Sequence, residues 1–175
     1  ELFRSHQKVV ISGPSGMGKT SLAAKFVQGK RCFAYRGGTE DLIKSGIQEL
    51  LEFCGYNQTD ENKTHVIEFF KEHGTPLQDQ IILFDGVNSR EGLYLIEESF
   101  PNDPRFQILV TTTLGVDELF FKAKGFVINY MQKGEATSYL LSSVSVEQRT
   151  EQEKEAEELA VGLKGIPGLL KEVVL

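Results

Sequence analysis

The chain has 175 residues, of which 40% are hydrophobic and 25% charged, and its formal net charge is −6. This composition is typical of an ordinary globular protein with one domain, or with one domain and part of a second. The negative charge argues against a general nucleic-acid binder, because duplex binding depends mainly on neutralising phosphates with Lys and Arg. No apolar run approaches the roughly 20 residues that span a bilayer, so we expect no membrane segment.

Cysteine usage and the two ends of the sequence bear on its setting. Cys32 and Cys54 are the only cysteines, too few for a disulfide framework, which favours a reducing, cytoplasmic compartment. The sequence starts at Glu1 and stops at Leu175 within an apolar run, so we expect it to be a piece of a longer protein.

Short apolar strands alternate with helices over most of the chain. We predict strands at residues 8–12, 32–35, 81–84, 107–110 and 126–128. A first helix is predicted from about Lys19, with Leu22 and Phe26 on one face, and a second after the N-cap Thr39. Nearly continuous apolar strands joined by helices indicate an α/β fold with a five-stranded parallel sheet covered on both faces.

Two further helices are predicted between the later strands. A polar loop at 55–63 precedes a helix marked by Val66, Phe69 and Phe70, and another helix precedes the fourth strand. The apolar positions that follow helical spacing in the second and fourth helices are Ile43, Ile47, Leu50, Leu51, Leu93, Ile96 and Phe100.

Helices alone are predicted after about Gln132. Thr150 and Glu153 fit a capping box for one of them, Gly165 ends it, and Pro167 can begin the next. We therefore predict an α/β domain at 1–132 and the beginning of a helical domain at 133–175.

The strongest signal is a phosphate-loop motif between the first strand and the first helix. It reads Gly13-Pro14-Ser15-Gly16-Met17-Gly18-Lys19-Thr20. Glycines let the backbone turn its N–H groups toward phosphate oxygens, and the following helix directs its positive end at the same anion. We predict that a nucleotide is bound by Gly13, Gly16, Gly18, Lys19, Thr20 and Ser21; the alternative is a glycine-rich turn without a ligand.

Mg²⁺ binding is predicted from two oxygen-bearing side chains. Thr20 ends the motif, and Asp85 follows four apolar residues at the carboxyl end of the third strand, where parallel sheets bind ligands. The alternative for Asp85 is a solvated residue that only ends a strand.

Hydrolysis is less well supported by the sequence. Many related hydrolases have a second acid after the Mg²⁺-linked one, but here Gly86 takes that place. Asn88 or Glu91 could substitute, although each also suits a turn or a helix start. The threonines at 111–113 could present hydroxyls to the γ-phosphate, or could simply suit a strand as β-branched residues.

The order of these motifs resembles the NB-ARC branch of the STAND ATPases, which includes plant disease-resistance proteins and animal apoptosome ATPases. The resemblance covers nearly the whole chain. It includes the phosphate loop, the strand ending at Asp85, the threonines at 111–113, and the late Gly165-Ile166-Pro167-Gly168 segment. It implies a P-loop NTPase fold with a central Walker A strand and a small helical, ARC1-like domain.

The same resemblance implies roles for single residues. Pro167 would pack on the adenine of ATP or ADP, whereas without the resemblance it is only a helix break. Thr113 occupies the sensor position, where the family usually has arginine, and Gly86 stands where it has a second acid. Only twelve residues precede Gly13, and the family has an upstream segment that completes the adenine pocket.

The leading functional hypothesis is an ATP- or ADP-binding regulatory switch with slow or absent hydrolysis. The resemblance implies roles in innate immunity or apoptosis, contacts with other domains of the same chain, and self-oligomerisation. A scaffold that keeps a nucleotide as a structural ligand is the main alternative. A small-molecule P-loop kinase is less well supported, because the six arginines form no lid-like cluster.

Overall fold

The computed structural model describes residues 7–55, 80–100, 107–115 and 123–173. The predicted helix with Val66, Phe69 and Phe70, and the polar loop before it beyond Gly55, lie outside these ranges. The chain folds into two compact units, one of residues 1–13 and 19–127 and one of residues 14–18 and 128–175. The identity of these units as the two predicted domains remains a proposal.

A five-stranded parallel sheet forms the first unit, as the alternating pattern predicts. Its strands are β1 Lys8–Ser12, β2 Cys32–Arg36, β3 Ile81–Val87, β4 Gln107–Thr112 and β5 Lys124–Val127. They lie in the order β2-β3-β4-β1-β5. The strand before the phosphate loop is therefore inside the sheet, but β4 rather than β1 occupies its middle.

Burial separates the inner strands from the edges. All five residues of β1 are buried, and β4 is buried from Ile108 to Thr112. Edge strand β2, by contrast, has no fully buried residue. The resemblance implied a central Walker A strand; β1 has a strand on each side, as expected of an inner strand, but the middle position belongs to β4.

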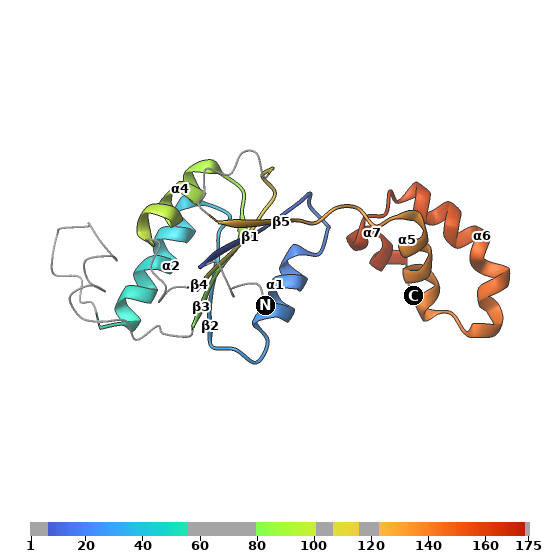
Figure 1. Ribbon diagram of the computed structural model, residues 1–175, viewed down its shortest axis with the longest axis horizontal. Coiled ribbons are helices and arrows are strands. Elements are labelled where there is room, and N and C mark those ends of the chain that lie inside the picture. The colour runs from blue at the N-terminus through green and yellow to red at the C-terminus, as the bar shows by residue number, and fades with distance from the viewer. Residues whose placement is uncertain (1–6, 56–79, 101–106, 116–122, 174–175) are drawn as a thin grey trace. The chain divides into compact units, whose positions relative to one another are not determined.

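Helices cover both faces of this sheet (Figure 1). Helices α2 Glu40–Phe53 and α4 Arg90–Ser99 lie on one face, and α1 Lys19–Val27 lies on the other. Thr39 is the N-cap of α2, as predicted, and its side chain accepts a hydrogen bond from the N–H of Leu42. The predicted buried face of α1 needs correction, because Leu22 is 47% exposed and the fully buried residue is Ala23.

The core of the first unit lies between the sheet and the pair α2 and α4. Its members are Val10, Ile43, Ile47, Leu50, Ile82, Phe84, Val87, Leu93, Ile96, Phe100, Ile108 and Val110. Small residues let the layers approach: a Cβ at Gly46 would lie 2.6 Å from the ring of Tyr35. This core holds the carboxyl ends of β1, β3 and β4 along one edge of the sheet.

The helical part of the second unit consists of α5 Lys133–Leu140, the 3₁₀ turn η2 Leu141–Ser143, α6 Val146–Gly162 and α7 Pro167–Val173. Its core contains Ala136, Leu140, Ala156, Ala160 and Leu170. As predicted, the chain breaks at Gly165, whose φ is +62°, and the next helix begins at Pro167. Among the residues that the structure describes, no helix combines the length and apolarity needed to cross a bilayer.

The predicted capping box was wrong. Helix α6 begins at Val146 after the N-cap Ser145, so Thr150 and Glu153 lie inside it. The side chains of Ser145 and Gln148 are 3.2 Å apart, and Ser145 makes no side-chain hydrogen bond to the backbone of the first turn. Once the helix has started there, Thr150 has no free helix end to cap.

Candidate functional site

The phosphate loop joins the buried end of β1 to the first residue of α1. Its glycines Gly13, Gly16 and Gly18 have φ values of +151°, +79° and +82°. Residues with a Cβ rarely adopt such values, so the spacing of the motif follows directly from the backbone path of the loop. Ser21, the last predicted loop residue, is exposed in the first turn of α1.

Lys19, which follows the last glycine of the loop, has a buried side chain. Its ammonium group donates a hydrogen bond to the carbonyl oxygen of Gly13 at 2.7 Å. Burial lowers the pKa of Lys19 from its ordinary value, and the charge of Asp85 raises it in part. A desolvated ammonium group at the end of a glycine loop is suited to binding phosphate oxygens.

Thr20 and Asp85 come together at the carboxyl edge of the sheet, although 65 positions separate them. The hydroxyl of Thr20 lies 3.0 Å from both carboxylate oxygens of Asp85. Asp85 is held by β3, whose strand continues through it to Val87 instead of ending there as predicted. The structure thus places the two predicted Mg²⁺-linked residues in direct contact.

Thr111, at the end of β4, also contacts the carboxylate. Its hydroxyl lies 2.5 Å from Oδ1 of Asp85 and accepts a hydrogen bond from the N–H of Gly86 at 2.7 Å. Sequence reasoning named the threonines at 111–113 but singled out Thr113. Phe84 pairs with Val110, so knowing that β3 and β4 are neighbours would have placed Thr111 level with Asp85.

Thr113 itself is exposed and lies one residue beyond the end of β4. Thr112, between Thr111 and Thr113, is fully buried and accepts a hydrogen bond from the N–H of Leu114 at 3.1 Å. The two alternatives to a second acid, Asn88 and Glu91, lie just before α4 and in its first turn. The sensor role of Thr113 stays a prediction.

Gly86 lies at an irregularity in the pairing of β3 with β4. The register shifts between Phe84 and Val87, and Gly86 has a φ of +77°. A Cβ at this position would meet no atom within 4 Å. The backbone conformation, and not a lack of space, therefore favours glycine where related hydrolases have an acid.

The second unit has its own close contacts around the Gly165–Gly168 segment. A Cβ at Gly165 would lie 2.2 Å from the carbonyl oxygen of Met131, and the N–H of Gly168 donates to the carbonyl of Gly16 at 2.8 Å. Both Gly16 and Gly168 belong to this unit. Pro167 is partly buried as the first residue of α7; its predicted contact with adenine stays a prediction.

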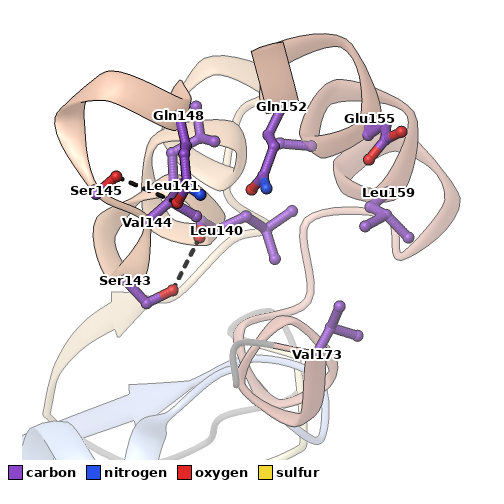
Figure 2. A pocket seen from close by; sticks show the side chains of 11 residues that line it. Leu140, Leu141, Ser143, Val144, Ser145, Gln148, Gln152, Glu155, Leu159 and Val173 are labelled. Carbon is purple, nitrogen blue, oxygen red and sulfur yellow. Dashed lines mark hydrogen bonds between the residues drawn. The ribbon is translucent and has the colours of Figure 1, made fainter. Parts of the chain in front are cut away.

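The second unit contains a cavity of about 340 Å³. Figure 2 shows that its walls combine apolar side chains, among them Leu140 and Leu159, with the amides of Gln148 and Gln152. It contains no residue predicted to bind phosphate or Mg²⁺.

The oxygen donors present are suited to Mg²⁺. In the described ranges, no three or more His, Cys, Asp or Glu side chains are grouped so that they could hold a metal ion by themselves. Mg²⁺ commonly takes only one or two protein oxygens and completes its shell with water and substrate phosphates. The hydroxyl of Thr20 and the carboxylate of Asp85 form such a partial set.

The comparisons with known proteins identify the fold. No family model and no curated protein sequence matches the chain. Among solved structures, a Walker-type ATPase of Pyrococcus abyssi is 19% identical with a TM-score of 0.58, over 97% of this chain and 62% of that one. A STAND protein with a tetratricopeptide repeat sensor from Pyrococcus horikoshii is 23% identical with a TM-score of 0.58, over 97% of this chain and 27% of that one.

At these identities the likeness shows the fold alone. The chain has the fold of the P-loop ATPases, with a five-stranded parallel sheet flanked by helices. A STAND protein is among the solved structures that share this fold. The chain spans only 62% and 27% of the lengths of these two proteins, and the NB-ARC branch stays a prediction.

Proposed function

We propose that the chain is the ATP- or ADP-binding module of a larger STAND-type signalling protein. The contact between Thr20 and Asp85 is the observation that carries this proposal, because two residues far apart in sequence form a partial Mg²⁺ ligand set beside a phosphate loop. The fold shared with Walker-type and STAND proteins supports it.

Each residue of the site has a separate task in this proposal. The glycine loop offers backbone N–H groups to the phosphates, and Lys19 offers its ammonium to the β- and γ-phosphates. Mg²⁺, when bound, neutralises phosphate charge. Thr20 supplies a hydroxyl ligand and Asp85 orients the water shell of the ion. Pro167 is proposed to contact the adenine.

Slow or absent hydrolysis is part of the proposal. An in-line attack on the γ-phosphate needs a positioned water, and Gly86 has no side chain with which to orient one. Thr113 carries no charge that could stabilise the transferred phosphoryl group. The positive φ of Gly86 supports this proposal, because glycine adopts that conformation most readily and supplies no carboxylate.

The module would act as a switch if ADP and ATP favour different states of the whole protein. A ligand shifts such an equilibrium only through a difference in affinity for the two states. We propose that the other domains of the same protein and further copies of it are the partners, in a cytoplasmic signalling pathway of the immunity or cell-death type. This part of the proposal rests on the resemblance to NB-ARC proteins.

A scaffold that keeps its nucleotide permanently is the second candidate, and the glycine bulge at Gly86 favours it as well. The two candidates differ in exchange: a switch releases ADP and takes up ATP, whereas a scaffold retains one nucleotide. Measuring the dissociation rate of a fluorescent ADP from the full-length protein distinguishes them.

Nucleotide binding itself is tested by calorimetric titration with ADP and Mg²⁺. We expect Lys19→Ala to abolish most of the binding. Lys25→Ala is the matched control, because Lys25 is an exposed lysine on the same helix and should leave the affinity unchanged. If Lys19→Ala binds ADP as tightly as the unmodified protein, the nucleotide lies elsewhere and the proposal fails.

A further inference from the structure

Two hydroxyl groups contact the carboxylate of Asp85, and they differ in which of its oxygens they contact. The hydroxyl of Thr20 is 3.0 Å from each oxygen, so it does not distinguish between them. The hydroxyl of Thr111 contacts Oδ1 alone, at 2.5 Å. Oδ1 is therefore the more fully bonded oxygen, and Oδ2 has the greater remaining capacity to accept.

The directions of the two Thr111 hydrogen bonds follow from the chemistry of its two partners. A hydroxyl has one proton to donate, and the oxygen of Thr111 already accepts from the N–H of Gly86 at 2.7 Å. Because an ionised carboxylate can only accept, the Thr111 proton is directed at Asp85. Thr111 is 1% exposed, so water has little access to replace this contact.

The irregular pairing of β3 explains why the N–H of Gly86 is available. Regular parallel pairing would engage it in the ladder with a β4 carbonyl. Here the register shifts between Phe84 and Val87, and the left-handed φ of Gly86 accompanies a hydrogen bond to a side chain of β4. The glycine that replaces a second acid thus contributes to the site through its backbone.

We propose that Thr111 is a positioning residue that orients Asp85 for Mg²⁺. Held by the N–H of Gly86, it anchors Oδ1 and leaves Oδ2 to face the ion or its water shell. This inference rests on the proposed nucleotide-binding function and assigns a role to a residue that the sequence pattern did not single out. It concerns the Mg²⁺ dependence of binding, whereas Lys19 and the glycine loop serve the phosphates directly.

The test measures ADP affinity as a function of Mg²⁺ concentration and again in EDTA. Thr111→Val keeps the shape of the side chain but removes the hydroxyl. We expect it to raise the Mg²⁺ concentration required for half of the effect about tenfold, the lower end of what outer-shell partners of metal ligands contribute. Affinity in EDTA should stay unchanged, and Thr111→Ser should restore the Mg²⁺ dependence because it restores the hydroxyl.

Thr112→Val is the matched control, since it removes a buried hydroxyl from the next residue of the same strand without touching Asp85. It should lower the thermal midpoint but leave the Mg²⁺ dependence as it was. If Thr111→Val does not fold, Gly86→Ala provides the same test. It strains the φ that accompanies the N–H bond to Thr111, and there is open space for its Cβ.

The outcomes separate this inference from the proposed function. If the unmodified protein binds ADP and Thr111→Val, or Gly86→Ala in its place, shows the same Mg²⁺ dependence, the positioning role is wrong and the nucleotide site stands. An equal loss of affinity with and without Mg²⁺ would show a purely structural role and would also overturn the inference. If the unmodified protein binds no nucleotide, the proposed function and this inference fall together.

Discussion

The ammonium nitrogen of Lys8 lies 3.0 Å from Oε2 of Glu97, which joins strand β1 to helix α4. The two partners differ in exposure, because the side chain of Lys8 is 1% exposed and that of Glu97 is 24% exposed. Strand β1 leads directly into the phosphate loop. The ion pair therefore links the strand before the loop to helix α4.

The difference in exposure predicts unequal effects of mutation. Glu97→Gln should lower the free energy of unfolding by about 1–3 kcal/mol, because it removes one negative charge beside a buried ammonium group. Lys8→Met should cost less, since the remaining carboxylate reaches water. Guanidinium unfolding of both variants and of the double variant measures this. Additive losses in the double-mutant cycle would show that the pair does not interact.

The apolar strands and their order along the chain were predictable because each is a local pattern. Val9, Val10 and Ile11 are buried as their sequence predicts, and Thr39 caps α2 where it was expected. Sheet neighbours were not predictable in the same way, because pairing joins segments that are distant in sequence. For this reason the middle position of β4 was missed.

The candidate site also has a part that a local pattern predicts and a part that depends on strand pairing. The phosphate loop is a contiguous motif, and its glycines have the positive φ values that such a motif requires. The contact between Thr111 and Asp85 depends on the register of two strands, which the sequence alone does not give. Strand residues alternate in direction, so choosing among three consecutive threonines needs that register.

Two glycines near the end of α6 should respond to alanine in opposite ways. Gly165→Ala should cost about 2–4 kcal/mol, because it places a Cβ at a φ of +62° and 2.2 Å from the carbonyl oxygen of Met131. Gly162→Ala meets no atom within 4 Å, and alanine favours helix, so it should stabilise by up to about 1 kcal/mol. Thermal unfolding compares them. Equal shifts would mean that the turn at Gly165 adapts freely.

The predicted contact of Pro167 with adenine can be tested by comparing a ligand that has the base with one that has only phosphates. If Pro167 packs on adenine, Pro167→Ala should weaken ADP binding and leave pyrophosphate binding unchanged, because only ADP carries the base. Calorimetric titration with both ligands measures this. Leu169→Ala on the same helix is a control for general weakening of α7, since Leu169 is 46% exposed. An unchanged ADP affinity would return Pro167 to the role of a helix starter.

Slow hydrolysis is the part of the proposed function that rests on the absence of an acidic side chain at Gly86. We predict a single-turnover rate for ATP well below about 1 s⁻¹, the lower end for ordinary kinases. Gly86→Asp combined with Thr113→Arg should raise that rate, because it supplies an acid to orient water and a charge to stabilise the phosphoryl group. Asp is among the residues that best tolerate a positive φ, and the position has open space for its Cβ.

Gly86→Asn with Thr113→Arg is the matched control for this restoration. Asparagine accepts the same backbone conformation as aspartate but carries no negative charge with which to activate water. The rate should therefore rise with aspartate and stay low with asparagine. Equal rates in both variants would show that the lack of a carboxylate at residue 86 does not limit hydrolysis. Turnover of several per second in the unmodified protein would contradict the prediction outright. Another acid would then orient the water, with Glu91 in the first turn of α4 the first to replace by glutamine.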